Sequence, residues 1–377
     1  MRVSVSTRAA LSIAREPRLK ETCHREWRQY YHLSNTTYSA MNDRVTTALA
    51  DAFPNRSVDR LADTGPSWNG ATETLEVVFT DGSRAFCKVA TDGDRRRIAR
   101  ERAVLRYVAA ERPVRVPEVL AADPDAAVPY LVTRPAPGRG LLGAWDRATD
   151  TDREALLRRV GATLATLHAE RFERAGEITG EASEGDGSTA LALDSAPWPD
   201  VLRSTIDRTR EIGTSERLAD HYDAVIDCVE ANRDSLAGAP AALLHGDIAK
   251  PNLFVDDGPD RPPAAGSALS PDGVVPIDWE LAHVGDPARD LVRAADQLLN
   301  GFDTTGPERF STALYEGYRD RAGGLPVGFA KRAPIYRVVR MLGRSGFVDQ
   351  WTTYLDEPID ELVARADAEL QARLDAI

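Results

Sequence analysis

The spacing of hydrophobic residues changes partway along the chain, and this change most constrains the fold. From residue 72 to 79, hydrophobic and polar residues largely alternate, which is typical of a half-buried strand. Asp81-Gly82 follows, a strong signal for a hairpin turn, and residues 85–90 supply the returning strand. After about residue 140 the spacing becomes helical. The sequence therefore predicts an α+β fold with two lobes, a mostly antiparallel sheet followed by a larger helical part.

Further elements follow from the same patterns. In the first lobe we expect a helix at 95–110 and strands at 117–120 and 130–133. In the second lobe we expect helices near 152–170, 198–212, 216–236, 288–300, 307–321, 329–349 and 357–375. Residues 176–197 are rich in Gly, Ser and Ala, and we expect them to be irregular. Residues 258–273 are rich in Pro, Gly and Ala, and we interpret them as a hairpin insertion between short strands at 253–255 and 274–277.

The first 40 residues differ from the rest of the chain. Residues 1–40 are net basic, whereas the whole protein carries a net charge of -12. We expect either a flexible extension or a mis-called start with Met41 as the true first residue, ahead of a helix at 43–53. The remaining chain then divides into an N-terminal lobe, 41–134, and a C-terminal lobe, 135–377, at a turn-rich segment.

Charge and composition exclude several classes of protein. A nucleic-acid-binding protein normally has a basic surface, which the net charge of -12 argues against. No apolar run approaches the length of a membrane span, and no signal-peptide core is present, so we expect a cytoplasmic protein without a membrane partner. The three cysteines, Cys23, Cys87 and Cys228, form neither a metal-binding spacing nor a disulfide framework. Nothing in the sequence predicts an oligomeric state.

The motif with the clearest chemistry follows an apolar run, 241–244. His245-Gly246-Asp247 comes next, then four residues, then Asn252, which is the spacing of a kinase catalytic loop. Asp247 would accept the proton of an attacking hydroxyl, and Asn252 would offer a neutral oxygen to a metal ion. We expect His245 to tie the loop backbone by hydrogen bonds. An isolated Asp and Asn at this spacing would more often belong to an ordinary loop, but the flanking apolar strands strengthen the signal.

A second acidic residue ends the apolar strand at 274–277. Asp278 at that position is well placed to hold magnesium between two phosphates. Asp286, followed by Pro287, is typical of a helix N-cap, and we prefer that structural role for it. Asp290 is expected to brace the loops beneath the metal site.

The first lobe should supply contacts to nucleotide phosphates. Lys88 lies on the returning strand of the hairpin, and Glu101 is the one acidic residue inside the following predicted helix, so we expect them to pair. A solvated lysine and a surface glutamate would be the usual interpretation without the second lobe's motif. Ser67, in the turn-rich segment Gly65–Gly70, is a candidate phosphate donor. Lys250 either neutralises charge on the transferring phosphate or is merely solvated.

Together these motifs resemble the aminoglycoside phosphotransferase family, relatives of choline and homoserine kinases. In that family the catalytic loop has the pattern of residues 245–247 with the downstream Asn252. The metal-binding Asp is commonly followed by Trp-Glu, as in residues 278–280, and then by Gly-Asp-Pro, as in residues 285–287. Residues 130–134 are similar to the family's linker between the lobes, whose backbone meets adenine.

This resemblance implies a bilobal protein-kinase-like fold, ATP and Mg²⁺ as cofactors, and adenine contacts near Tyr130 and Val132. It implies an ATP-dependent phosphotransferase that acts on a hydroxyl of a small molecule. Gly246 stands where protein kinases usually have Arg, and few residues separate Asp278 from Gly285, which leaves no room for a long activation segment. A nucleotide-binding pseudokinase and a protein Ser/Thr kinase-like regulator are the alternatives.

The acceptor is not predicted by the motifs. Trp279, Glu280 and aromatic residues of the helices after residue 300 are candidates to line its site. The acidic net charge would suit a cationic acceptor such as an amino sugar, although adaptation to a salt-rich cytosol explains that charge equally well.

Overall fold

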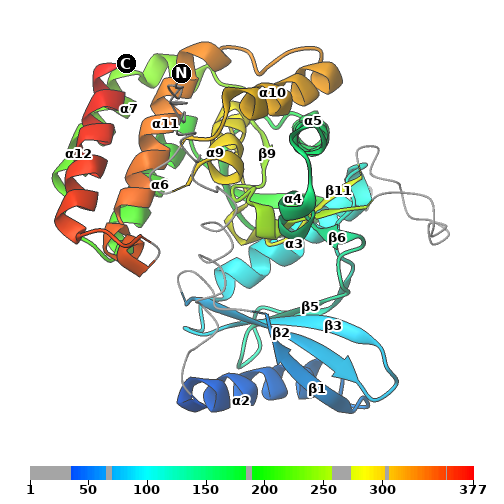
Figure 1. The fold of residues 1–377 in the computed structure, drawn as a ribbon. Helices are drawn as coiled ribbons and strands as arrows, with labels where there is room; N and C mark the ends of the chain where they lie inside the picture. Colours follow the sequence, from blue (N-terminus) through cyan, green and yellow to red (C-terminus); the bar gives the residue numbers. More distant parts are fainter. Residues whose placement is uncertain (1–34, 65–69, 184–188, 257–272, 302–304, 354) are drawn as a thin grey trace, which may run out of the picture.

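The computed structural model describes residues 35–64, 70–183, 189–256, 273–301, 305–353 and 355–377. A small lobe is built around one antiparallel sheet, and the larger lobe is mainly helical (Figure 1). The small-lobe sheet has the strand order β1-β2-β3-β5-β4. Its strands are β1 (Val58–Asp63), β2 (Thr72–Phe79), β3 (Arg84–Ala90), β4 (Val119–Asp123) and β5 (Tyr130–Thr133). The predicted α+β class and the hairpin at Asp81-Gly82 are therefore confirmed.

Two helices cover opposite faces of this sheet (Figure 1). α2 (Asn35–Ala52) packs on the face that carries Cys87 and Val89, and α3 (Arg95–Glu111) packs on the face that carries Leu131. Because successive side chains of a strand point to opposite faces, Lys88 of β3 points towards α3. α2 begins eight residues before the helix expected at 43–53, since no Gly or Pro interrupts residues 35–42.

The large lobe contains two small sheets among its helices. One has the order β11-β10-β6, from β6 (Arg139–Gly140), β10 (Leu253–Val255) and β11 (Val274–Pro276). The other has the order β8-β7-β12-β9, from β7 (Gly176–Ser183), β8 (Thr189–Ser195), β9 (Ala242–Leu244) and β12 (His283–Gly285). The helices are α4 (Leu141–Arg147), α5 (Asp150–Leu167), α6 (Trp198–Ile212), α7 (Asp220–Ala231), α8 (Arg233–Ala237), α9 (Pro287–Leu299), α10 (Glu308–Ala322), α11 (Phe329–Ser345) and α12 (Ile359–Asp375).

The β7–β8 hairpin corrects the expectation that residues 176–197 are irregular. Small residues hide its pattern, and its hydrophobic residues, Ile178, Leu191 and Leu193, pack in the same cluster as α3 of the other lobe. The sequence pattern of residues 176–197 did not predict strands, because the helix that covers their hydrophobic residues, α3, lies far upstream in the sequence. The predicted insertion at 258–273 falls almost wholly outside the described residues, although the strands on either side of it, β10 and β11, do pair.

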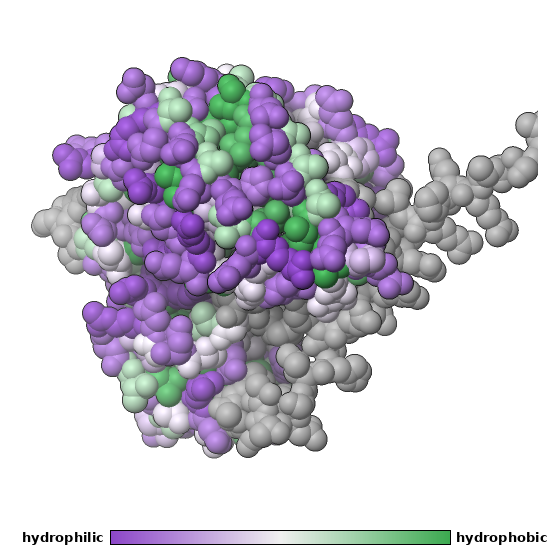
Figure 2. Space-filling view, turned by 90° about the vertical axis from the view of Figure 1, so that its left-hand side faces the viewer, coloured by the Kyte–Doolittle hydropathy of each residue, from purple (hydrophilic) through white to green (hydrophobic). Residues whose placement is uncertain are grey.

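The surface of the described residues is hydrophilic, as the charged composition predicts. The face in Figure 2 is mostly hydrophilic, with scattered small hydrophobic patches. Within the part of the chain that the structure describes, no helix combines the length and apolar character needed to cross a membrane.

Candidate active site

The loop after β9 carries the first predicted site residues, and α9 holds it in place. The Asp290 carboxylate accepts hydrogen bonds from the backbone N–H groups of His245 (2.9 Å) and Gly246 (3.0 Å). Burial would raise the pKa of Asp290, but its hydrogen bond with His168 and the backbone hydrogen bond from His245 outweigh burial and hold that pKa well below its usual range. A charged carboxylate thus ties the loop to the first turn of α9.

Glycine is required at position 246 for two reasons. Its φ is 80°, in the left-handed region that favours glycine. A Cβ at this position would also lie 2.4 Å from the backbone oxygen of Leu281. The loop can therefore approach the segment after β11 only with glycine here.

Both ring nitrogens of His245 are used by the backbone. Nε2–H donates to the carbonyl of Ile277 (3.0 Å), and Nδ1 accepts from the N–H of Asp247 (3.1 Å). Burial lowers the pKa of His245, which keeps the ring neutral, and the ring packs against Trp279 with 4.3 Å between centroids. This arrangement matches a structural role and leaves no ring nitrogen for a substrate proton.

Asp247 lies at the centre of a polar cluster from the loop and α9. Its Oδ2 accepts from Asn252 Nδ2 (2.8 Å), while Oδ1 accepts from Gln297 Nε2 (2.5 Å) and Arg293 Nη2 (3.2 Å). Burial would raise the pKa of Asp247, but the charge of Arg293 and the Gln297 hydrogen bond outweigh it and lower that pKa below its usual value. Asp247 is therefore an ionised acceptor at neutral pH.

The β10–β11 hairpin brings Asn252 and Asp278 together. β10 begins directly after Asn252 and pairs antiparallel with β11, which ends two residues before Asp278. The N–H of Ile277 donates to the carbonyl of Asn252 (2.9 Å) at the open end of the hairpin. Asp278 has φ 66°, and among the described residues no other non-glycine residue has a positive φ. Such a conformation costs about 1–3 kcal/mol and is typical of functional sites.

Lys88 crosses from the small lobe to the carboxylate of Asp278. Its Nζ donates to Glu101 Oε2 (2.7 Å) and Asp278 Oδ1 (2.6 Å), and Glu280 Oε2 lies 3.7 Å away. Burial would lower the pKa of Lys88, but the three carboxylates raise it well above its usual value, so the ammonium stays charged. The structure therefore brings the predicted pair, Lys88 and Glu101, together with Asp278.

Trp279 and Glu280 do not line an acceptor site, contrary to one expectation. Trp279 is fully buried beneath the loop, and its backbone N–H donates to Glu101 (3.2 Å). Glu280 turns towards the small lobe, where Arg97 (2.9 Å) and Thr72 (3.1 Å) donate to its carboxylate. The expectation failed because the short turn after Asp278 points these side chains back towards α3 and β2.

The adenine contacts expected near Tyr130 and Val132 need a correction. Both side chains pack in the cluster beneath α2, and the Tyr130 hydroxyl donates to Asp51 (2.9 Å). Strand β5 is also paired along both edges, with β3 and with β4, so its backbone groups are committed to the sheet. The N–H of Arg134, directly after β5, is also used, since it donates to the carbonyl of Glu118 (2.9 Å).

Two remaining predicted residues have less definite places. Ser67 lies outside the described residues. Lys250 begins the short 3₁₀ turn that ends at Asn252, and its Nζ lies 4.8 Å from the ring centroid of Trp145. Lys250 therefore packs on an aromatic face near the loop.

Sequence reasoning missed the arginines behind Asp247. Arg289, Arg293 and Gln297 follow one another at intervals of four residues and share one face of α9. Arg340 of α11 lies on the facing helix. The spacing along the helix after Gly-Asp-Pro was a readable signal, but only the packing of α9 shows that this face reaches Asp247.

The donor groups around Asp278 fit a magnesium ion. Asn252 directs both its Nδ2 hydrogen bonds to Asp247, which leaves its Oδ1 as an acceptor. A neutral oxygen beside a carboxylate suits Mg²⁺, which takes one or two protein ligands and completes its shell with phosphates and water. Among the described residues no cluster of three or more His, Cys, Asp and Glu could hold a metal ion.

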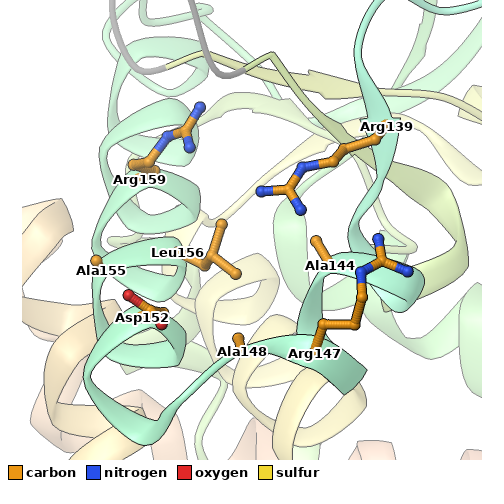
Figure 3. Close-up of a pocket in the computed structure, with 8 residues that line it drawn as sticks. All are labelled: Arg139, Ala144, Arg147, Ala148, Asp152, Ala155, Leu156 and Arg159. Atoms are coloured by element: carbon orange, nitrogen blue, oxygen red, sulfur yellow. The ribbon is translucent and has the colours of Figure 1, made fainter.

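Two arginine-lined cavities lie in the large lobe. The larger, of about 290 Å³, lies between β6, α4 and α5, where Arg139, Arg147 and Arg159 surround it (Figure 3). None of the predicted site residues lines it. The smaller, of about 50 Å³, lies between α6, α9 and α11 and shares Arg293 with the Asp247 cluster.

Comparisons with known proteins agree with this geometry. Residues 67–335 match the phosphotransferase enzyme family. A protein assigned as a fructosamine-3-kinase from Thermobifida fusca YX-ER1 is 21% identical, with a TM-score of 0.53, over 87% of this chain and 98% of that one. The macrolide 2'-phosphotransferase MphH from Brachybacterium faecium is 20% identical, with a TM-score of 0.51, over 85% and 97%. The ADP-bound aminoglycoside phosphotransferase APH(2'')-Ib is 14% identical, with a TM-score of 0.50, over 88% and 97%.

No curated protein matches the sequence. The similarity to the three solved structures shows the fold, while the family match spans most of the chain and includes the loop, both metal-ligand candidates and Lys88. The chain therefore belongs to the phosphotransferase enzyme family.

Proposed function

We propose that the enzyme transfers the γ-phosphate of ATP to a hydroxyl group of a small molecule, with Mg²⁺ as cofactor. One observation carries the proposal: Asp247, Asn252, Asp278 and Lys88, from both lobes, are linked through short hydrogen bonds and backbone pairing into one site. These are the groups that phosphoryl transfer needs, since its loose transition state depends on positioning and charge neutralisation more than on covalent chemistry. We place the reaction in the cytoplasm, where ATP is available.

Each residue has a part in this mechanism. Lys88, steadied by Glu101, would bind the phosphates, and Asn252 and Asp278 would hold the magnesium ion, which neutralises phosphate charge when bound. Asp247 would accept a hydrogen bond from the acceptor hydroxyl, aim its oxygen at the γ-phosphorus and take its proton. The depressed pKa of Asp247 makes it a weak base, so orientation of the hydroxyl would be its main contribution.

The segment after Asp278 supports a small acceptor. A short 3₁₀ turn (Trp279–Leu281) with its C-cap Ala282, then β12 and the N-cap Asp286, occupy all the residues up to α9. Asp286 is itself buried, with Arg332 (2.6 Å) and Tyr336 (2.6 Å) donating to its carboxylate. A long segment that docks a peptide substrate, as in protein kinases, has no place here.

The test is Asp247→Asn, which keeps the shape of the side chain and removes its charge. We expect phosphate transfer from radiolabelled ATP, over a panel of hydroxyl compounds, to fall by about 10³-fold or more, because the hydroxyl is no longer oriented or deprotonated. Affinity for a fluorescent ATP analogue should change by less than about threefold. Asp223→Asn, at an exposed ion pair on α7, is the matched control. Near-normal turnover of Asp247→Asn would rule out Asp247 as the base.

A further inference from the structure

The smaller cavity is built by rows of residues on three helices. α6, α9 and α11 pack together, and each contributes residues four positions apart, which share one helix face. The cavity is lined by Thr205, Thr209, Arg289, Arg293, Tyr336, Val339, Arg340 and Gly343. Three guanidinium groups and two hydroxyl-bearing threonines thus surround it, and no acidic residue lines it.

Arg289 brings a buried charge that no carboxylate balances. Arg289 is only 7% exposed, and within the described part of the chain no carboxylate oxygen lies within 4.0 Å of its guanidinium. Its hydrogen-bond partner is Nε2 of His283, which is free to accept because Nδ1–H donates to the carbonyl of Leu281. The positive charge of His283 is absent, since burial and the neighbouring arginine lower its pKa to about 3.

Among the described residues, the other deeply buried arginines are paired with acids. Arg332 donates to Asp286 at 2.6 Å, and Arg100 reaches Glu177 at 3.4 Å. Burial of an unpaired charge is costly, so proteins normally supply a partner or reserve the site for a ligand. Arg289 is therefore the exception, and it lies at the cavity.

The neighbouring arginines add to the excess of positive charge around the cavity. Arg340 shares Asp296 with Arg344, and Arg293 shares the Asp247 carboxylate with amide donors. Burial and the mutual repulsion of these guanidinium groups lower the pKa of Arg289 and of Arg340 to about 10. An anion in the cavity would relieve this repulsion.

The cavity also lies next to the reacting position. Arg293 lines it and donates to Asp247 Oδ1 at 3.2 Å. A group held in the cavity would thus be one side chain away from the carboxylate that orients the acceptor hydroxyl. With about 50 Å³ of space, the cavity suits a single polar head rather than a whole sugar ring.

We propose that this cavity binds an anionic oxygen group of the acceptor, a carboxylate or a phosphate, and that the acceptor is therefore a hydroxy acid or a phosphorylated alcohol rather than a cationic amino sugar. This inference rests on the proposed function. Guanidinium groups bind both anions through paired, charge-assisted hydrogen bonds, and Thr205 and Thr209 can donate in addition. The acidic net charge of the chain therefore does not predict the charge of its acceptor.

The first experiment measures anion binding directly. Calorimetry with the nucleotide site saturated by ADP and Mg²⁺ would use inorganic phosphate and malonate as probes, glycerol as the neutral control and kanamycin as the cation. We expect an anion to bind, glycerol and kanamycin not to bind, and Arg289→Gln to weaken the anion by about tenfold or more. Phosphate and malonate as separate arms distinguish the two kinds of anionic group.

Two further variants keep the result interpretable. Arg340→Gln tests the same cavity from another helix if Arg289→Gln fails to fold, because Asp296 keeps Arg344 as its partner. Arg147→Gln removes the same charge from the larger cavity in Figure 3 and should leave affinity within about twofold. Absence of anion binding, an unchanged affinity in the Arg289 and Arg340 variants, or a loss only in Arg147→Gln would overturn the proposal.

A second experiment separates this inference from the proposed function. Phosphate transfer would be compared over matched acceptors, such as gluconate, glucose 6-phosphate, glucose and kanamycin. We expect anionic acceptors to be used and their KM to rise by about tenfold or more in Arg289→Gln, with the KM for ATP unchanged. Preference for glucose or kanamycin would refute the inference while the kinase assignment stands. Failure to bind ADP would instead refute the proposed use of ATP.

Discussion

The two sides of the active site have opposite charge balances. On the small-lobe side, the ammonium of Lys88 lies among three carboxylates, those of Glu101, Asp278 and Glu280. On the α9 side, the carboxylate of Asp247 is approached by Arg293, with further arginines behind it. Each cluster leaves one sign of charge in excess.

This difference indicates what each side is built to receive. Excess negative charge around Lys88 suits a cation, so magnesium would release Asp278 from Lys88 and leave the lysine for phosphate. Excess positive charge behind Asp247 suits an anionic acceptor. Nucleotide and acceptor would then be held by different clusters of one site.

Removal of the charge on Asp278, in the negative cluster, should cause the largest loss of activity. We expect Asp278→Ala to reduce phosphate transfer by about 10³-fold and to weaken Mg²⁺-nucleotide binding, because a carboxylate beside the phosphates is lost. Affinity for ADP would be measured with and without Mg²⁺, and the enhancement by Mg²⁺ should disappear. Asp278→Asn controls for the left-handed backbone, which asparagine tolerates. An enhancement that persists in both variants would remove Asp278 from the metal site.

Replacement of the cation in the same cluster should have a smaller effect on activity and an added effect on stability. Lys88→Met should lower transfer by about 10²-fold and destabilise the fold by about 3–5 kcal/mol, since buried carboxylates lose their partner. Burial already raises the pKa of Glu101 to about 7, and loss of the Lys88 ammonium removes the charge that opposes this rise, so the loss of stability should grow as the pH rises from 5 to 8. Thermal unfolding at both pH values measures this, with Lys331→Met, at an exposed site of α11, as the control. A loss independent of pH would contradict the electrostatic cause.

The residues of the catalytic loop and of the negative cluster were predictable because local patterns carry them. Asp247 and Asn252 share one loop, and Asp278 ends a strand whose hairpin partner begins after Asn252. Lys88 follows from strand alternation, and Glu101 from its place on the next helix. Each of these requires only neighbouring elements to form.

The positive cluster depends on contacts between distant helices, which local patterns do not encode. Arg289 and Arg340 become neighbours only when α9 packs against α11. The β7–β8 hairpin was missed for the same reason, since its hydrophobic side is completed by α3. The adenine contact expected near Tyr130 failed for another reason. Both edges of strand β5 are paired with neighbouring strands, and the sequence of β5 alone does not reveal this pairing.

The smallest expected effect comes from a substitution at Arg293, which tests whether the positive cluster controls the pKa of the proposed base, Asp247. Arg293→Gln removes the charge that most lowers the pKa of Asp247, so that pKa should rise. As the proposed base, Asp247 would act when ionised, and it is protonated as the pH falls through its pKa. The acid limb of kcat, measured at saturating acceptor, should therefore move to higher pH, with a loss of about tenfold or less at pH 7. Arg293→Lys should restore most of the wild-type profile, and Arg337→Gln, at an exposed position of α11, should leave the profile unmoved. If Arg293 only supports the fold, kcat will fall equally at every pH, and the two clusters will have to be treated as independent.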